Sequence, residues 1–483
     1  MKSPSFIVFA LVCLLYTAPA LQAVEPPNFV LLIVDDVSPE DLGCYGCAHA
    51  ETPHIDKLAK DGLRFANAYL ATSSCSPSRC AIITGRYPHN HGAPELHTTL
   101  PLDQPTFVQS LRDVGYHTVI SGKNHMSDKK KAADIGFAVE SPGKGPGKQE
   151  DWVELLRSRP KNRPFFFWFA SSDAHRGWNW DDENLVYNPD DIEVPPYLFD
   201  GPKTRQDLAD YFHEVSRMDT YVGRVRDELE RQGVEDNTWI IFMADNGRAF
   251  PRSKTRLYDS GIKTPFIVYA PGRIKPEVTD SLVSSIDISA TLLDLAGIEK
   301  PATVQGISFA PVLRDPAAIT RNVVFAEHNW HVNSAHERMV RHGDWVYIRN
   351  SFPHLQSLAQ EQDRSYPAGE ELWNMEDAGK LDPASQRDIF LVPRPADELY
   401  HVGRDPNQLT NLAANPEYRD QLKSLKTLLD RWIKETGDSI PKNPTPDRVY
   451  IDGVKQPQAR GERPGESQNA TTVNAPGPVL VDP

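Results

Sequence analysis

Residues 75–86 read CSPSRCAIITGR, and they form the most specific pattern in the chain. Pro77 suits the first helical position, where its missing N–H would have no partner, and Gly85 suits the position that ends a helix. The pattern therefore predicts a short helix whose N-terminus points at Cys75. Because the free N–H groups at a helix N-terminus favour negative charge, we expect an anion to bind there.

Five apolar runs outside this stretch have the character of buried strands, and helical stretches lie between them. The runs cover residues 28–34, 117–121, 164–170, 238–244 and 266–270. Residues 205–232 place apolar side chains at helical spacing, which predicts a long helix with one buried face. This alternation predicts an α/β domain whose sheet is covered by helices on both faces, with ligands beyond the carboxyl ends of the strands.

Polar residues follow four of these runs directly. The four pairs are Asp35 and Asp36, Lys123 and His125, Asp173 and His175, and Asp245 and Asn246. Their common position at strand ends predicts one composite site. The oxygen ligands of the first and last pairs suit calcium or magnesium better than zinc. Helix capping or turn formation is the ordinary role of an Asp pair, but the position of both pairs after buried strands favours a metal site.

The run from Cys75 to Arg86 resembles the signature C-x-P-S-R-x-x-x-x-T-G-R of the formylglycine-dependent type I sulfatases. The resemblance implies their α/β fold, an alkaline phosphatase-like mixed sheet flanked by helices, with a smaller C-terminal α+β domain. It also implies that a formylglycine-generating enzyme or an anaerobic sulfatase-maturating enzyme oxidises Cys75 to formylglycine. The hydrated aldehyde has two hydroxyls: one attacks sulfur, and the other allows the covalent sulfate to leave. The alternative is an ordinary buried cysteine.

The same resemblance implies one calcium ion per chain and a set of residues around the sulfate. The implied metal ligands are Asp35, Asp36, Cys75, Asp245 and Asn246. The implied catalytic residues, matched through C-S-P-S-R, G-K-N-H, D-A-H and K-T-R-L-Y-D-S-G, are Cys75, Arg79, Lys123, His125, His175 and Lys254. Arg79 would stabilise the diol, His125 would help to deprotonate its spare hydroxyl, and His175 with Lys254 would assist the leaving group. A solvated basic loop is the alternative for Lys254.

Further motifs resemble the sulfamidases, or N-sulfoglucosamine sulfohydrolases, within this family. They are Asp245-Asn246-Gly247 with Phe250-Pro251, and Leu257-Tyr258. The implied reaction is release of sulfate from a sulfated glycan, with N-sulfoglucosamine of heparan type as the substrate. Three alternatives stay open: an arylsulfatase-like O-sulfate ester hydrolase, a phosphate or phosphonate ester hydrolase, and a non-catalytic sulfated-glycan-binding protein with an unmodified cysteine. A cluster that includes His328, Trp330 and His331 could line a sugar subsite or be only a loop.

Four parts are expected along the chain. Residues 1–23 have the pattern of a signal peptide, and no later segment is long or apolar enough to span a bilayer. We expect a catalytic domain at residues 24–365 and a smaller subdomain at 366–440, with strands at 370–373 and 397–402 and a helix at 418–436. Residues 441–483 predict a flexible tail or a draped extension. The protein is therefore expected to be exported, to the periplasm, the cell exterior or, in a eukaryote, the lysosome.

Charge and cysteine content argue against several protein classes. The formal net charge of -14 opposes attraction of polyanions, so we expect no nucleic-acid partner, and a sulfated saccharide must be held by local cations. Four cysteines remain beyond the leader, at positions 44, 47, 75 and 80, which is not a disulfide framework. The sequence leaves open whether the chain is a monomer or a homodimer.

Overall fold

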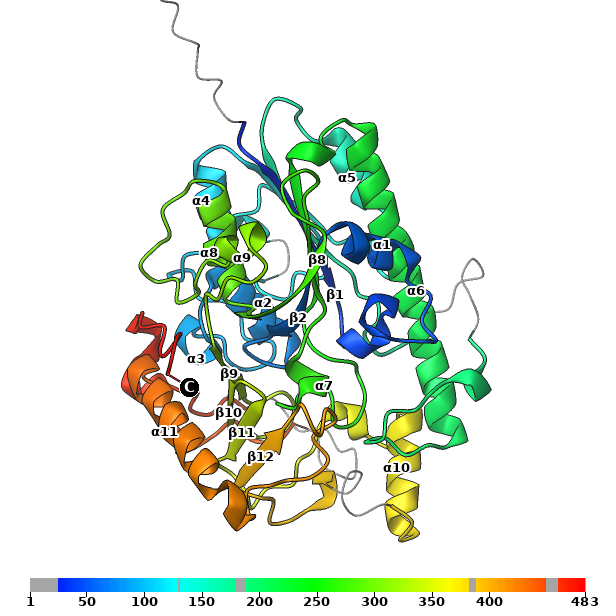
Figure 1. Cartoon of the computed structure of the whole chain (residues 1–483), viewed down its shortest axis with the longest axis vertical. Helices are drawn as coiled ribbons and strands as arrows, with labels where there is room; N and C mark the ends of the chain where they lie inside the picture. Colours follow the sequence, from blue (N-terminus) through cyan, green and yellow to red (C-terminus); the bar gives the residue numbers. More distant parts are fainter. Residues whose placement is uncertain (1–24, 129–130, 179–186, 382–387, 449–458, 483) are drawn as a thin grey trace, which may run out of the picture.

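An eight-stranded mixed sheet runs through the centre of the molecule (Figure 1). The structure is a computed structural model that describes residues 25–128, 131–178, 187–381, 388–448 and 459–482, so the signal peptide expected at residues 1–23 lies outside the described residues. The strands are β1 (Asn28–Val34), β2 (Leu63–Tyr69), β3 (His117–Gly122), β4 (Val139–Ser141), β5 (Phe165–Ala170), β6 (Thr238–Ala244), β7 (Phe266–Tyr269) and β8 (Glu277–Ser284). The five strands expected from the sequence all form, within one residue of their expected ends.

The strand order is β4-β3-β5-β1-β6-β7-β2-β8. All the strands are parallel except β7, which runs antiparallel to both of its neighbours. The strands β1, β5 and β6 lie side by side at the centre, where Ile33 pairs with Ala170 and Val34 with Ala244. The residues that follow these three strands therefore meet at one edge of the sheet.

Helices cover both faces of this sheet (Figure 1). On one face lie α2 (Cys75–Thr84), α4 (Phe107–Asp113), α8 (Asp287–Leu295) and α9 (Ala310–Arg314), and on the other lie α1 (Pro53–Asp61), α5 (Trp152–Ser158) and α6 (Pro202–Arg231). Alternate residues of β1 explain the two layers, because Leu31 and Ile33 belong to one apolar core while Val30 and Leu32 belong to the other. No helix among the described residues has the length and apolar character needed to cross a membrane.

A second, antiparallel sheet lies beside the carboxyl edge of the first (Figure 1). It contains β9 (Val323–His328), β10 (Glu337–His342), β11 (Trp345–Asn350) and β12 (Asp397–His401), in the order β12-β11-β10-β9. The helix α11 (Arg419–Thr436) packs on it through Leu425, Leu429 and Trp432. The strand and helix expected at 397–402 and 418–436 are confirmed. This sheet begins at β9, upstream of the boundary expected at residue 366.

The strand expected at residues 370–373 is wrong, because these residues lie inside the helix α10 (Pro367–Asp377). The buried residues of α10 include Ala368, Glu371 and Leu372, which follow the spacing of one helical face. Pro367 occupies the first turn, where its missing N–H has no cost. A window of four residues was too short to separate this helical period from a strand.

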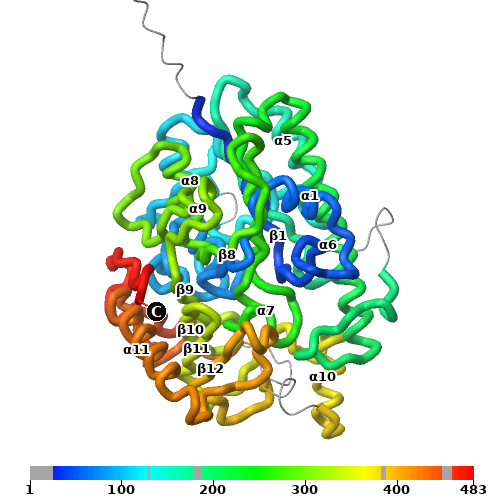
Figure 2. The backbone as a smooth tube through the Cα atoms, viewed as in Figure 1, coloured from blue at the N-terminus to red at the C-terminus, as the bar shows by residue number. Residues whose placement is uncertain are grey.

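The described parts of the C-terminal tail, residues 441–448 and 459–482, pack against the rest of the protein. Of the two expectations for residues 441–483, these parts correspond to the draped extension and not to the flexible tail. Asn90 of the short helix α3 (Pro88–His91) donates hydrogen bonds to the carbonyls of Thr436 and Ala470, at 2.8 and 2.7 Å. Near the end of the chain, Asn322 donates to the Val481 carbonyl at 2.6 Å and accepts from its N–H at 2.9 Å. Figure 2 shows this tail, in red, beside α11.

Candidate active site

Helix α2 positions Cys75 at its first residue, with Ser74 as the N-cap. The helix thus begins two residues before Pro77, which is tolerated because the first-turn N–H groups have no partner within the helix. Gly85 ends the helix at φ 65°, and a Cβ there would lie 2.7 Å from Val304 and 2.9 Å from the Ser289 side chain. Glycine is therefore required at this position for both conformation and space.

Acidic and amide side chains at the ends of β1 and β6 gather around Cys75. One ligand atom from each of Asp35, Asp36 and Cys75 lies within 4.8 Å of the others, and all three residues are buried. Asn246 donates to Asp36 Oδ1 at 2.6 Å, and the Asp36 N–H donates to Asp245 Oδ1 at 3.2 Å. We call these five residues the Cys75 centre.

Two buried oxygens of the Cys75 centre have no hydrogen-bond donor in the structure, namely Asp35 Oδ1 and Asn246 Oδ1. Carboxylate and amide oxygens of this kind fit a hard divalent cation such as calcium, which gives each of them a partner. Asp36 accepts one hydrogen bond at each oxygen, from Asn246 and Lys254, and Asp245 does so from Asp36 and Arg79, which leaves a lone pair on each oxygen for a cation. The thiol of Cys75 is a soft ligand in this set, so an oxygen at position 75 would fit a hard cation better.

Two buried cations, Arg79 and Lys254, and the half-buried Lys123 surround these carboxylates. Arg79 lies 2.7 Å from Asp245 Oδ2 through Nη2 and 3.7 Å from Asp35 Oδ2. Lys123 forms an ion pair with Asp35 Oδ2, and Lys254 Nζ lies 2.6 Å from Asp36 Oδ2. Burial opposes the charged form of Lys254, but the Asp36 carboxylate together with Glu361 and Asp35 outweighs it and holds the pKa well above its usual value. All three cations therefore remain charged beside the Cys75 centre.

Burial also raises the pKa of the Cys75 thiol, to about 12, although Lys123 and Lys254 act in the opposite direction. An unmodified Cys75 would therefore carry its proton at neutral pH. A protonated thiol is a weak nucleophile, which makes an ordinary cysteine mechanism a poor fit to this position.

Two of the expected histidines are held as neutral imidazoles. Burial and the charge of Lys123 lower the pKa of His125 far below its usual value. The charge of Lys254, followed by burial, lowers the pKa of His175 to about 3. His125 Nε2 lies 2.7 Å from His97 Nδ1, while its buried Nδ1 has no hydrogen-bond partner. His175 has its Nδ1 at 3.0 Å from the Arg176 carbonyl oxygen.

The structure adds two histidines that the sequence analysis did not assign to the catalytic set. His97, at φ 60° in the loop after α3, contacts His125, and its N–H donates to Ser76 Oγ at 2.9 Å. His331 Nδ1 lies 2.8 Å from Ser74 Oγ, so it fastens the loop after β9 to the N-cap of α2. His331 belongs to the cluster noted in the sequence, whereas no local pattern marked His97.

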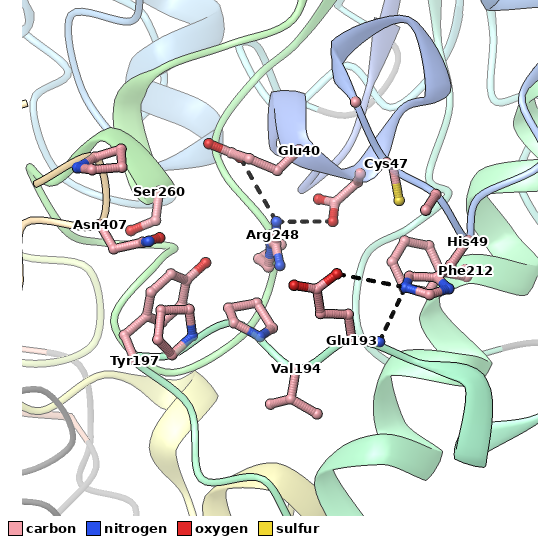
Figure 3. A pocket seen from close by; sticks show the side chains of 16 residues that line it. Glu40, Cys47, His49, Glu193, Val194, Tyr197, Phe212, Arg248, Ser260 and Asn407 are labelled. Atoms are coloured by element: carbon pink, nitrogen blue, oxygen red, sulfur yellow. Dashed lines mark hydrogen bonds and ion pairs between the residues drawn. The ribbon is translucent and has the colours of Figure 1, made fainter. Parts of the chain in front are cut away.

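A cavity of about 250 Å³ lies beyond the loop that carries Asn246 (Figure 3). Arg248 lies at its centre, with Nη2 at 3.0 Å from Asp41 and 3.7 Å from Glu40. Glu193 points towards His49 across the same space, at 3.9 Å. None of the expected site residues lines this cavity, so it is separate from the Cys75 centre.

Comparison with known proteins gives consistent matches. Residues 27–140 and 149–298 match the family Sulfatase, and residues 252–349 match "N-sulphoglucosamine sulphohydrolase, C-terminal". The chain is 30% identical to N-sulphoglucosamine sulphohydrolase of Homo sapiens over 473 residues, covering 88% of this chain and 93% of that protein. It is 29% identical to an ulvan-active sulfatase of Formosa agariphila, covering 91% of this chain and 80% of that protein.

A solved structure has a similar fold. It is described as a complex with the substrate D-glucosamine-2-N,6-O-disulfate, and it aligns with a TM-score of 0.64 at 20% identity. The alignment covers 85% of this chain and 98% of that one. At this identity the match bears on the fold alone.

Proposed function

Because the chain belongs to the sulfatase family, and is therefore a sulfate ester or sulfamate hydrolase, we propose that it releases sulfate from a sulfated glycan with N-sulfoglucosamine as its substrate. Its large mixed sheet flanked by helices, with a separate antiparallel C-terminal sheet, is the alkaline phosphatase-like fold of that family. The match of residues 252–349 to the C-terminal part of N-sulphoglucosamine sulphohydrolases supports cleavage of a nitrogen–sulfur bond.

The observation that carries the proposal is the position of Cys75. Its side chain lies at the N-terminus of α2 and within 4.8 Å of two buried carboxylates, while Lys123 and Lys254 each pair with one of them. We propose that a maturation enzyme converts Cys75 to formylglycine, whose hydrate supplies an oxygen nucleophile. Calcium held by Asp35, Asp36, Asp245, Asn246 and the converted residue 75 would supply positive charge for the sulfate and for that nucleophile.

The chain's own residues then have distinct tasks. Arg79, Lys123 and Lys254 hold positive charge where a sulfate oxygen gains negative charge. The neutral His125, hydrogen-bonded to His97, can accept a proton from a nearby hydroxyl. His175 lies in the field of Lys254, and this pair is placed to hold or deliver a proton at the leaving nitrogen or oxygen. These roles need no residue outside the described site.

A second candidate is an O-sulfate ester hydrolase, which the ulvan-active relative supports at 29% identity. Sulfate release should be measured from glucosamine and uronate saccharides that carry single N-, 2-O-, 3-O- or 6-O-sulfates. We expect release from the N-sulfated sugar. Release from an O-sulfated sugar alone would select the second candidate, and turnover of aryl phosphate in preference to aryl sulfate would contradict both.

The state of residue 75 needs its own experiment. Mass spectrometry of the peptide that contains residue 75 should show the mass of formylglycine in active enzyme. An active protein that retains the cysteine mass in full would refute the proposed nucleophile, and an inactive protein with that mass would indicate a host that does not convert it.

A further inference from the structure

Arg256 is a buried cation that forms no ion pair with a described residue, although the carboxylates of Glu337 and Asp388 attract it from farther away. Its side chain is 3% exposed, and Nη2 donates to the Ser357 carbonyl. Both Nε and Nη1 are buried and have no hydrogen-bond partner in the part of the chain that the structure describes. Among the described residues, no carboxylate lies within ion-pair distance of its guanidinium. Buried charged donors are normally paired, so this group calls for a partner that the chain itself does not supply.

Arg252, four residues earlier on the same loop, shows the ordinary arrangement. It is equally buried, but its three nitrogens donate to Asp388, to the Asn407 carbonyl and to the Gln408 carbonyl, at 3.0, 2.9 and 2.5 Å. The loop is thus able to satisfy a buried guanidinium fully. The lack of partners for Nε and Nη1 of Arg256 therefore does not reflect a general shortage of acceptors around this loop.

That position adjoins the Cys75 centre. Arg256 lies two residues after Lys254, and between them Thr255 donates its N–H to the carbonyl and the hydroxyl of Ser73, both at 3.0 Å. Ser73 immediately precedes the N-cap of α2. The loop that carries Lys254 and Arg256 is therefore fastened directly to the chain that presents Cys75.

Neighbouring side chains place Arg256 beside a further group of imidazoles. Its charge acts on His328, whose Nδ1 lies 3.2 Å from Glu337 Oε2. His328 in turn acts on His331, which contacts Ser74 at the tip of α2. Glu337 is already paired with Arg394, so it leaves Arg256 without a carboxylate. Burial lowers the pKa of His328 and His331, and Arg394 is paired with Glu337, so the unpaired positive charge in this group is that of Arg256.

We propose that Arg256 binds a second anionic substituent of the substrate, a carboxylate or a further sulfate, on the sugar that carries the scissile group or on the sugar next to it. The inference rests on the proposed function, because it requires a saccharide bound at Cys75. The free Nε–H and Nη1–H groups of Arg256 point from different edges of the planar guanidinium, so a carboxylate or a sulfate can accept a charged hydrogen bond from either of them. Arg256 is thus a specificity-determining residue, distinct from the residues that act on the scissile sulfate.

The test is a binding experiment in the Cys75→Ala protein, which cannot turn the substrate over. Isothermal titration calorimetry would compare N-sulfoglucosamine, glucosamine 2-N,6-O-disulfate and an N-sulfoglucosamine–uronate disaccharide. Adding Arg256→Gln should weaken binding of a dianionic ligand by about 10- to 100-fold, which is the usual effect of losing a charged hydrogen bond. Binding of the monoanionic ligand should weaken by less than about threefold. The dianionic ligand that loses affinity identifies the second anion as sulfate or carboxylate.

Two further variants separate recognition from folding. Arg256→Lys keeps the charge but replaces the planar guanidinium donors with one ammonium group, so we expect an intermediate loss of affinity. Arg273→Gln removes an exposed arginine and should change no affinity. An equal loss for all three ligands, no loss for any, or no saccharide binding at all would overturn the proposal. The proposed reaction can fail independently of the Arg256 proposal. That outcome would be a wild-type enzyme with formylglycine at residue 75 that releases no sulfate from N-sulfoglucosamine, while Arg256→Gln still weakens binding of the dianionic ligand alone.

Discussion

Replacing Arg86 with methionine should destabilise the protein strongly, although Arg86 lies outside the reacting centre. Arg86 ends the twelve-residue pattern that begins at Cys75, and it is 1% exposed. It has no carboxylate partner among the described residues. Its nitrogens instead donate to oxygens of Asn90, Thr303, Thr471, Val473 and Asn474, over distances of 2.6 to 3.2 Å.

The expected cost can be worked from these contacts. Hydrogen bonds from a charged donor contribute about 1.5–3 kcal/mol each, and Arg86 makes contacts with five different residues. Desolvation offsets much of the sum, because burial lowers the pKa of Arg86 to about 10. Methionine fills a similar volume but leaves the buried acceptors unpaired. We therefore expect Arg86→Met to lower the free energy of unfolding by about 3–5 kcal/mol.

Urea unfolding followed by tryptophan fluorescence would measure this change, with Arg273→Met as the exposed control. A second measurement uses protein that lacks residues 470–483. Three of the five partner residues lie in that segment, so the cost of Arg86→Met should fall by about half in the shortened protein, as coupled sites do. A cost below about 1 kcal/mol, or an equal cost in both backgrounds, would refute the role assigned to Arg86.

Three other predictions concern the site and its rim. Chelation of divalent cations should abolish sulfate release and lower the melting temperature, with both restored by calcium, because Asp35 Oδ1 and Asn246 Oδ1 lose their partner; unchanged activity would contradict this. Lys254→Met should lower kcat/KM by about 100-fold with an unchanged circular dichroism spectrum, and a loss below about tenfold would exclude its role. Burial raises the pKa of Glu95 from 4.5 to about 7, so the folded state holds a proton that the unfolded state has lost, and stability should fall as pH rises from 4.5 to 7. In Glu95→Gln, the fall in the free energy of unfolding between pH 4.5 and 7 should be smaller by up to about 3 kcal/mol, as measured by urea unfolding at several pH values. A fall equal to that of the wild type would contradict the prediction.

The sequence predicted the centre of the sheet better than its edges. The runs at β1, β5 and β6 are uninterrupted and apolar because helices cover both faces of these strands. At one end of the sheet, the edge strand β8 (sequence EVTDSLVS) is partly exposed, and its inner neighbour β2 contains Arg64 and Asn67, so neither has an apolar run. Edge strands are specified by their pairing partners, which a local pattern does not contain.

The position of residues at strand ends predicted most of the site for the same reason. Asp35 and Asp245 follow neighbouring strands, so their meeting is a consequence of sheet order. His97 could not be found in this way, because a loop contact with His125 brings it to the site. The crowded basic loop was equally ambiguous in sequence. The structure distinguishes its members by their partners: Arg252 has Asp388, Lys254 has Asp36, and Arg256 has no carboxylate at ion-pair distance among the described residues.

Charge balance at the Cys75 centre explains how an acidic protein can attract a sulfate. The chain carries a formal charge of -14, yet Asp35, Asp36 and Asp245 are matched by the three cations Arg79, Lys123 and Lys254. A fourth buried carboxyl group, Glu361, lies 3.7 Å from Lys254, and burial raises its pKa. A divalent cation added to this balanced set leaves a net positive charge in a buried space. Surface charges more than about 10 Å away are screened by salt, whereas the buried set is screened much less. An anion that reaches the site is therefore attracted by the local excess, and the cation Arg256 extends that excess towards the rest of the bound saccharide.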